Sequence, residues 1–368
     1  MEKEIKERLQ RLACALIDQE TANIFVEPQA GSEGFWFGGG NVICDSDGTF
    51  WLCGRYRNHG DSRTGVGSGE RGLELAIFSS DSVLGPWEKK KSFTKKELQN
   101  GNDKIVSIEG TSLLIGPAGV ELYLSTEKDR SYPSNFIDYQ KKGTGIWDID
   151  IVKSDSIMGL DPGSVYTAIS SDELGSLHVK DPVAFQIPGD NDQTGVLFCS
   201  HPYTWASSNT GLAVRESGHD QYKIESVNVF PRGNSWDVAC TRITDRLPVP
   251  PLGVFSGMSP ISIYFYDGAE CLRSLNESNI GVSRARGFSC EEIGGMAAGF
   301  DQSFPEICRI SSHEPMFVSP HGTGCSRYVS TLITPEGVLA TWQQSQENLS
   351  QPLVGNFLPN QQIEEIFS

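Results

Sequence analysis

The feature that most limits the possible folds is a strand-rich unit that recurs along the chain. Each unit contains short apolar runs separated by turns rich in glycine and proline, with a polar residue near the start of its first run. In chain order, these polar residues are Asn41, Glu109, Asp181, Asp237 and His321. Their spacings are 68, 72, 56 and 84 residues, with a mean of 70.

A unit of that length has room for four antiparallel strands with their loops, which is one blade of a β-propeller. Five such units account for residues 35–368, so the sequence predicts an all-β, five-bladed β-propeller over this range. A pair of two-sheet sandwiches is the structural alternative, because it also consists of short alternating strands. The propeller is favoured because the polar residue stands at the same place in every unit.

Residues 1–34 are predicted to be a short N-terminal helix and a lead-in to the propeller. Ile5, Leu9, Leu12 and Leu16 recur at helical spacing, which indicates one helix within residues 1–20. This helix either covers the rim of the propeller or contacts a partner. The N-terminus lacks the apolar segment of a secretion signal, and no apolar run approaches the ~20 residues of a membrane-spanning helix.

The charge balance limits the possible partners. The chain has 30 Lys+Arg against 47 Asp+Glu, a formal net charge of −17, and this argues against nucleic acid or an anionic membrane as a partner. Its nine cysteines are odd in number, form no C-x-x-C pair and mostly lie in apolar runs, as Cys44 and Cys199 do. We expect buried, reduced thiols and therefore a cytoplasmic location. The sequence does not indicate an oligomeric state.

In a propeller, the first strand of each blade lines the central channel, so the recurring polar residues are expected to converge at one mouth of it. Three of them, Glu109, Asp181 and Asp237, are carboxylates. Carboxylates that share a partly dry site shift one another's pKa values, which is how an acid/base pair for cleaving a glycosidic bond is produced. The plainer alternatives are a strand-edge charge for Glu109 and a turn cap for Asp181.

A second group of residues is predicted to bind substrate. Asn41 follows three glycines, which allow a ligand to approach the backbone closely, although a plain turn explains them equally well. Strand alternation places Arg55 and Arg57 on one face. There they are expected either to pair with carboxylates or to bind substrate, and a solvent-exposed face is the plainer alternative. The predicted substrate-binding residues are Asn41, Arg55, Arg57, His201, Trp236, Arg242 and His321; packing is the alternative for the tryptophan.

Four stretches resemble the five-bladed β-propeller glycoside hydrolases, the broad group of families 32, 43, 68, 117 and 130. GGGNVICDSDGTFWLCGRYRN resembles the start of the first blade in that group, and SDSVLGPWEKK is similar to an outer strand common in family 43. IEGTSLL resembles the start of a family-43 strand, and HVKDPVAF resembles the start of the third blade of family 32, with Lys180 in place of an arginine.

The resemblance implies a divergent glycosidase, exo-acting on a small or oligomeric glycan and working without a cofactor. We expect Glu109 as general acid, Asp181 as pKa modulator and orienter, and Asp237 as base or nucleophile; the three roles are open to exchange. Asn41 stands where the families have an aspartate, and an amide is neither a base nor a nucleophile. Two alternatives stay open: a Ca²⁺-dependent, lactonase-like hydrolase with the ion in the central channel, and a non-catalytic glycan-binding propeller.

Overall fold

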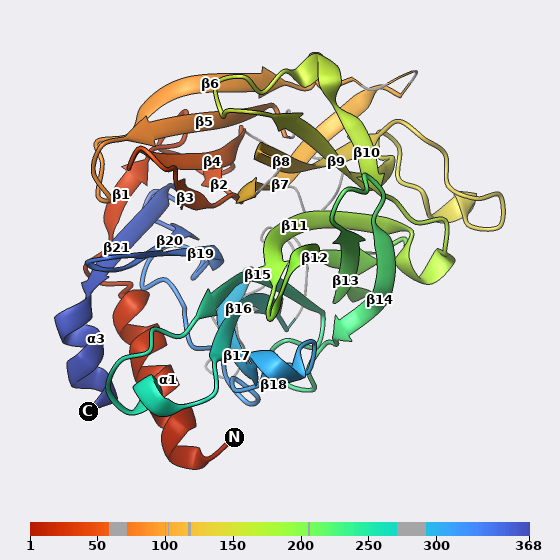
Figure 1. Ribbon diagram of the computed structural model, residues 1–368. Helices are drawn as coiled ribbons and strands as arrows, with labels where there is room; N and C mark the ends of the chain where they lie inside the picture. The colour runs from red at the N-terminus through yellow and green to blue at the C-terminus, as the bar shows by residue number, and fades with distance from the viewer. Residues whose placement is uncertain (59–71, 100, 102, 117–118, 205–206, 271–291) are drawn as a thin grey trace.

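Five antiparallel sheets surround a central channel in the computed structural model, which describes residues 1–58, 72–99, 101, 103–116, 119–204, 207–270 and 292–368 (Figure 1). The innermost strands contact one another in a closed ring, in the order β3, β7, β11, β15, β19 and back to β3. The predicted all-β, five-bladed propeller is therefore confirmed, and a pair of sandwiches is excluded.

Each blade is a sheet of neighbouring chain segments, ordered from the channel outwards. The first blade contains β2 (Trp36–Gly38), β3 (Val42–Cys44), β4 (Phe50–Arg57), β5 (Glu74–Ser80) and β6 (Glu88–Thr94). The second contains β7 (Ile105–Gly116), β8 (Gly119–Lys128), β9 (Ile146–Ser154) and β10 (Tyr166–Ile169). The third contains β11 (His178–Ile187), β12 (Asp190–His201), β13 (Asn209–Glu216) and β14 (Lys223–Phe230). The fourth contains β15 (Cys240–Pro248), β16 (Ile261–Ala269), β17 (Ile293–Phe300) and β18 (Cys308–Arg309).

The fifth blade joins the two ends of the chain. It contains β19 (Ser326–Thr334), β20 (Gly337–Gln344), β21 (Leu353–Pro359) and, as its outer strand, β1 (Asn23–Val26). β1 pairs with β21 in antiparallel register, from Asn23 opposite Gly355 to Val26 opposite Leu353. This sheet therefore includes a strand from the segment that the sequence suggested as a lead-in, and the pairing closes the ring.

The predicted N-terminal helix is present as α1 (Lys3–Leu16) and lies beside the C-terminal helix α3 (Asn360–Phe367) (Figure 1). Its apolar side, formed by Leu9, Leu12 and Leu16, packs into a core shared by blades four and five. The helix therefore covers part of the propeller itself. Neither of the two α-helices in the described ranges has the length and apolar composition that crossing a membrane requires.

Seven of the cysteines fall in the described ranges, and all seven are free thiols. Cys53, Cys199, Cys240 and Cys325 are buried, as predicted. Cys14, Cys44 and Cys308 are exposed, so the prediction of burial is wrong for Cys44, which lies at the solvent-facing end of β3. Cys271 and Cys290 lie outside the described residues.

One extra residue interrupts the innermost strand of every blade, which is the geometry of a β-bulge. The register shifts lie between Ile108 and Thr111 in β7, between Lys180 and Val183 in β11, between Ile243 and Asp245 in β15, and between Arg327 and Ser330 in β19. In the first blade, the same extra residue falls in the break between β2 and β3, around Gly39 and Gly40. A bulge changes the face of the sheet to which the local side chains point. The five bulges lie at the same level along the channel, so they redirect side chains there.

Candidate active site in the central channel

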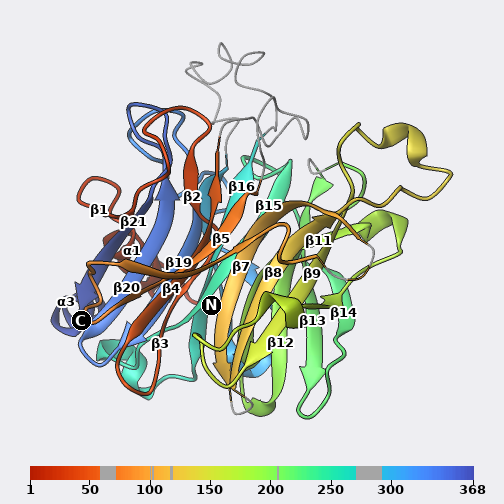
Figure 2. The ribbon, with the colours of Figure 1, turned by 90° about the horizontal axis from the view of Figure 1, so that it is seen from above.

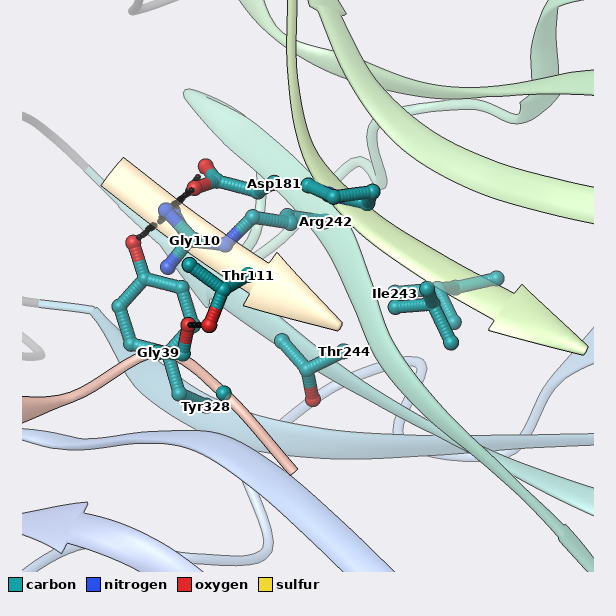
Figure 3. Close-up of a pocket in the computed structure, with 11 residues that line it drawn as sticks. Gly39, Gly110, Thr111, Asp181, Arg242, Ile243, Thr244 and Tyr328 are labelled. Carbon is teal, nitrogen blue, oxygen red and sulfur yellow. Dashed lines mark hydrogen bonds and ion pairs between the residues drawn. The ribbon is translucent and has the colours of Figure 1, made fainter. Parts of the chain in front are cut away.

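A small cavity lies where the bulges of the five inner strands meet (Figure 3). Together with the solvent at its open mouth it encloses about 250 Å³, and most of that space belongs to the mouth rather than to an enclosed chamber. Its wall contains backbone from Gly39 and Gly110 and side chains from Asp181, Arg242 and Tyr328. All five blades therefore contribute to one polar cavity, the place where the recurring polar residues were expected to converge.

Asp181 reaches this cavity from the bulge of β11. Its backbone is in the left-handed region, with φ of 55°, an uncommon conformation for a residue other than glycine. Oδ1 accepts a hydrogen bond from the Gly110 backbone N–H at 2.9 Å, and Oδ2 accepts one from Arg242 Nη1 at 2.9 Å. Burial raises the pKa of Asp181, but the charges of Lys180 and Arg242 outweigh burial and hold this pKa well below its usual range. Asp181 is therefore ionised at neutral pH.

Glu109 lies beside this cavity on β7 and contacts two arginines from β4. Arg55 donates to Oε2 through Nη2 at 2.9 Å and through Nε at 3.2 Å, and Arg57 donates to Oε1. All three side chains are buried. Arg55 and Arg57 therefore share a face, as expected. Of the three roles expected for them, namely pairing with a carboxylate, binding substrate and facing solvent, the structure shows the pairing with a carboxylate.

Arg242, on β15, connects the cavity to two further carboxylates that the sequence did not single out. Its Nη2 donates to Asp267 at 2.7 Å and to Glu292 at 3.0 Å. Burial raises the pKa of Asp267 to about 6, despite this contact. Glu292 also contacts Arg327 at 2.5 Å, and the two arginines lower its pKa against the effect of burial. The residues joined by these contacts are named the central ion network below: Arg55, Arg57, Glu109, Lys180, Asp181, Arg242, Asp267, Glu292 and Arg327.

Tyr328 is the cavity residue that the sequence reasoning missed. It lies at the bulge of β19 with φ of 55°, and its hydroxyl is 3.0 Å from Arg242 Nη1, 3.4 Å from Arg55 Nη2 and 3.4 Å from Asp181 Oδ1 (Figure 3). Burial raises its pKa to about 12, so the phenol is protonated at neutral pH. One signal could have identified it: a cation precedes the bulge residue both here, as Arg327, and in the third blade, as Lys180.

Asn41 does not extend into the cavity. Its amide nitrogen donates to the Leu113 carbonyl at 2.9 Å, and its oxygen accepts from the Leu113 N–H at 2.7 Å. These bonds join the first blade to β7 of the second. The first-blade residues that do line the cavity are Gly39 and Gly40, so this blade contributes no carboxylate there.

Asp237 lies three residues before β15, away from the other two predicted carboxylates. It contacts Arg309 Nε at 2.7 Å and the Tyr266 hydroxyl at 3.1 Å, and burial raises its pKa. The neighbouring Trp236 is fully buried, stacks on Tyr266 with ring centroids 5.5 Å apart, and donates to the Ser311 carbonyl. Trp236 belongs to an apolar cluster shared by blades three and four, whereas the two contacts of Asp237 lie within blade four.

The two predicted histidines do not line the cavity. His201 is buried and stacks on His178, with ring centroids 4.5 Å apart. His321 lies in the loop five residues before β19, is partly exposed and is 3.9 Å from Glu347. Substrate binding by either histidine stays a prediction.

The channel carboxylates contact basic groups rather than one another. Within the described ranges, no three His, Cys, Asp or Glu side chains come together in an arrangement that suits a metal ion. Glu109 and Asp181 instead contact arginines, and the amide of Asn41 is occupied by Leu113. The donor set required by a Ca²⁺-dependent hydrolase is therefore not assembled among the described residues.

Comparison of the sequence with models of protein families and with curated proteins gives no match. Comparison of the structure with solved structures does. A thermostable family-43 glycoside hydrolase superposes with a TM-score of 0.55 at 14% identity, covering 90% of this chain and 91% of that one. An arabinanase from Bacillus subtilis gives 0.53 at 12% identity, covering 92% and 98%. A family-32 β-fructofuranosidase from Bombyx mori gives 0.54 at 11% identity, covering 99% and 71%.

Identities this low show a shared fold and leave substrate and site residues undetermined. The superpositions extend over at least nine-tenths of this chain. The chain therefore has the five-bladed propeller fold of the family-43 and family-32 glycoside hydrolases, as a highly divergent example of it.

Proposed function

We propose that the protein is a glycoside hydrolase, exo-acting on a small or oligomeric glycan, with its reaction centre at the channel cavity. The observation that supports this most is the position of Asp181. It is an ionised carboxylate on a bulge of the inner strand, it faces the cavity, and it lies in a fold otherwise used by glycosidases. Its charge suits a role as base, nucleophile or modulator.

Glu109 and Tyr328 are the proposed partners of Asp181. Glu109 was expected to be the general acid, and to act as one it must release at least one of its two arginines. Tyr328 lines the cavity and is protonated, so it is the group that already has a proton to donate or share. The assignment of base or nucleophile to Asp237 stays a prediction, because its contacts lie outside the central ion network.

The test is hydrolysis of a panel of aryl glycosides that includes arabinofuranosides, xylosides and fructosides. We expect turnover of at least one substrate by the wild type, and a loss of about 10²–10⁴-fold in kcat/KM for Glu109→Gln and for Asp181→Asn. Asp237→Asn decides whether the third carboxylate takes part: a comparable loss supports its role as base. Full activity in both channel variants overturns the proposal.

A second candidate, a non-catalytic glycan-binding propeller, is favoured by two observations. The first blade presents glycine to the cavity, and Glu109 and Asp181 are already ion-paired. Thermal stabilisation by a glycan, without turnover of any substrate in the panel, supports this second function over the first.

A further inference from the structure

Three aromatic side chains form a cluster at the surface beside blades two and three. Phe136 and Tyr139 lie in the loop between β8 and β9, and Tyr203 follows the end of β12. Tyr139 and Tyr203 stack with ring centroids 4.3 Å apart at 25°, and Phe136 lies 5.8 Å from one and 5.9 Å from the other. Tyr139 is 55% exposed and Tyr203 is 39% exposed. These three residues are named the aromatic platform below.

The platform is at the same end of the propeller as the cavity's bulges. β8 ends where β7 begins, since Lys128 pairs with Ile105, and β12 ends where β11 begins, since His201 pairs with His178. Glu109 and Asp181 lie near the starts of β7 and β11. The loop that carries Phe136 and Tyr139 extends outwards beyond the ends of these strands (Figure 2).

Two contacts and two short chain segments lead from the platform to the cavity. Tyr203 is two residues beyond His201, which stacks on His178. His178 is two residues before Lys180, whose ammonium lies 3.8 Å from Asp181. The base of the platform is ordered as well, because Phe136 packs on a buried cluster of Tyr132, Ile146 and Leu177, and the Tyr132 hydroxyl is 2.9 Å from His178 Nε2.

We propose that the aromatic platform binds a sugar ring of a glycan chain whose end occupies the channel cavity. The enclosed part of the cavity is small and the rest is open to solvent, so an oligomeric glycan whose end reaches Asp181 must extend out over the surface. Exposed tyrosine rings offer a flat apolar face with a hydroxyl at the edge, which matches the C–H face and hydroxyl rim of a sugar.

The platform is too small for a stable protein partner. An interface between two proteins buries about 800 Å² on each side, whereas one aromatic side chain buries about 150–250 Å², and three rings that already cover one another offer much less than the required area. The exposed side chains of the same loop are mostly polar, namely Ser134, Asn135, Asp138, Lys141 and Lys142, with Ile137 as the apolar exception. A sugar residue is the occupant that fits this size and this rim.

The test separates binding at the platform from catalysis in the channel. The probes are arabinan, xylan and levan in affinity gels, and oligosaccharides of increasing length in calorimetry. We expect the wild type to bind at least one of these glycans, and Tyr139→Ala and Tyr203→Ala each to weaken binding of the polymer about tenfold, within the range of one aromatic contact. Hydrolysis of a monosaccharide aryl glycoside is expected to stay unchanged. The control is Leu84→Ala, an equally exposed apolar side chain on the first blade.

The inference extends the proposed function, yet its failure is distinguishable from the failure of that function. Polymer binding that depends on the tyrosines supports the platform even where no aryl glycoside is hydrolysed. Binding that is unchanged in the Tyr139→Ala/Tyr203→Ala double variant overturns it, and so does an absence of binding to all three polymers. A concentration-dependent dimer that the double variant abolishes also overturns it, because the surface is then an interface between two copies of the chain.

Discussion

The Tyr328 hydroxyl lies 3.4 Å from Asp181 Oδ1, across the channel from the fifth blade to the third. Both residues are at a β-bulge, and both have φ of 55°, while Leu349 is the only other non-glycine residue with positive φ in the described part of the chain. Such conformations cost about 1–3 kcal/mol each and persist where the surrounding structure holds them. Two such residues face each other over one cavity, and conformations of this kind cluster at functional sites in proteins.

Removing the Tyr328 hydroxyl is expected to impair the site and preserve the fold. Tyr328→Phe keeps the ring against Arg242 and removes the hydroxyl's hydrogen bonds to three charged groups, Arg242, Arg55 and Asp181. A hydrogen bond to a charged group is worth about 1.5–3 kcal/mol. We predict a fall of about 10–100-fold in kcat/KM on the best aryl glycoside. Tyr264→Phe is the control, because it removes the hydroxyl of another buried tyrosine, on β16 of blade four and outside the cavity. Equal effects of both changes on activity argue against a role for Tyr328.

Gly110 is predicted to be essential for the position of Asp181. A Cβ at residue 110 would lie 2.6 Å from Asp181 Oδ1, closer than real Cβ atoms come, and 3.0 Å from Asp181 Cα, which is a tight contact. Gly110→Ala must therefore displace the carboxylate or the bulge, and we expect loss of activity together with a lower midpoint of urea unfolding. Gly175→Ala is the matched change, since nothing lies within 4 Å of the added Cβ. A Gly110→Ala variant with wild-type activity would show that Asp181 tolerates displacement.

Asn41 is expected to contribute to stability through its two hydrogen bonds to the Leu113 backbone. Asn41→Asp keeps the acceptor but places a carboxylate against the Leu113 carbonyl, so we predict destabilisation of about 1–3 kcal/mol in urea unfolding. We also predict no increase in hydrolysis. A gain of activity would instead support the hypothesis that Asn41 replaces a catalytic aspartate of the resembling families.

The stability of the protein is predicted to fall as the pH drops below about 6.5, in part through His178. Burial lowers the pKa of His178 to about 3, and its Nδ1 accepts the Trp147 N–H at 3.2 Å, which leaves no room for a second proton there. Between about pH 6.5 and 3, the unfolded chain binds a proton that the folded state excludes, a loss of about 1.4 kcal/mol per pH unit.

The measurement for this prediction is urea unfolding between pH 4.5 and 6.5. His178→Gln retains an acceptor for Trp147 and does not titrate in this range. The slope of its unfolding free energy against pH should therefore be smaller than that of the wild type by about 1.4 kcal/mol per pH unit, the value for one proton. The same slope in both proteins would mean that His178 is accessible to protons in the folded state.

Much of the architecture was predictable because it depends on local patterns. The Asp-Gly turn between β3 and β4 marks a hairpin, and Gly48 has the positive φ that such a turn needs. Strand alternation correctly placed Arg55 and Arg57 on one face, and the polar residues of blades two and three lie on the predicted inner strands. The pairing of β1 with β21 was not predictable, because residues 355 and 23 are more than 300 positions apart.

The candidate site was harder to predict because one bulge in each inner strand shifts the alternation. In blades four and five, the polar residues chosen from the sequence precede the strands, whereas Arg242 and Tyr328 occupy the channel. Arg242 was predicted as a substrate-binding residue and not as a catalytic one. Tyr328 was not predicted, because it is an uncharged residue within an apolar strand. The central ion network also depends on Asp267 and Glu292, which come from outside the inner strands.

The most direct test of the central claim is a crystal structure of the protein with the sugar released from its best substrate. The account predicts one sugar residue in the channel cavity, with its anomeric carbon about 3–3.5 Å from an Asp181 carboxylate oxygen and a hydroxyl on Tyr328 or Arg242. A sugar bound with its anomeric carbon out of reach of Asp181, or an empty cavity at saturating sugar, would contradict the account.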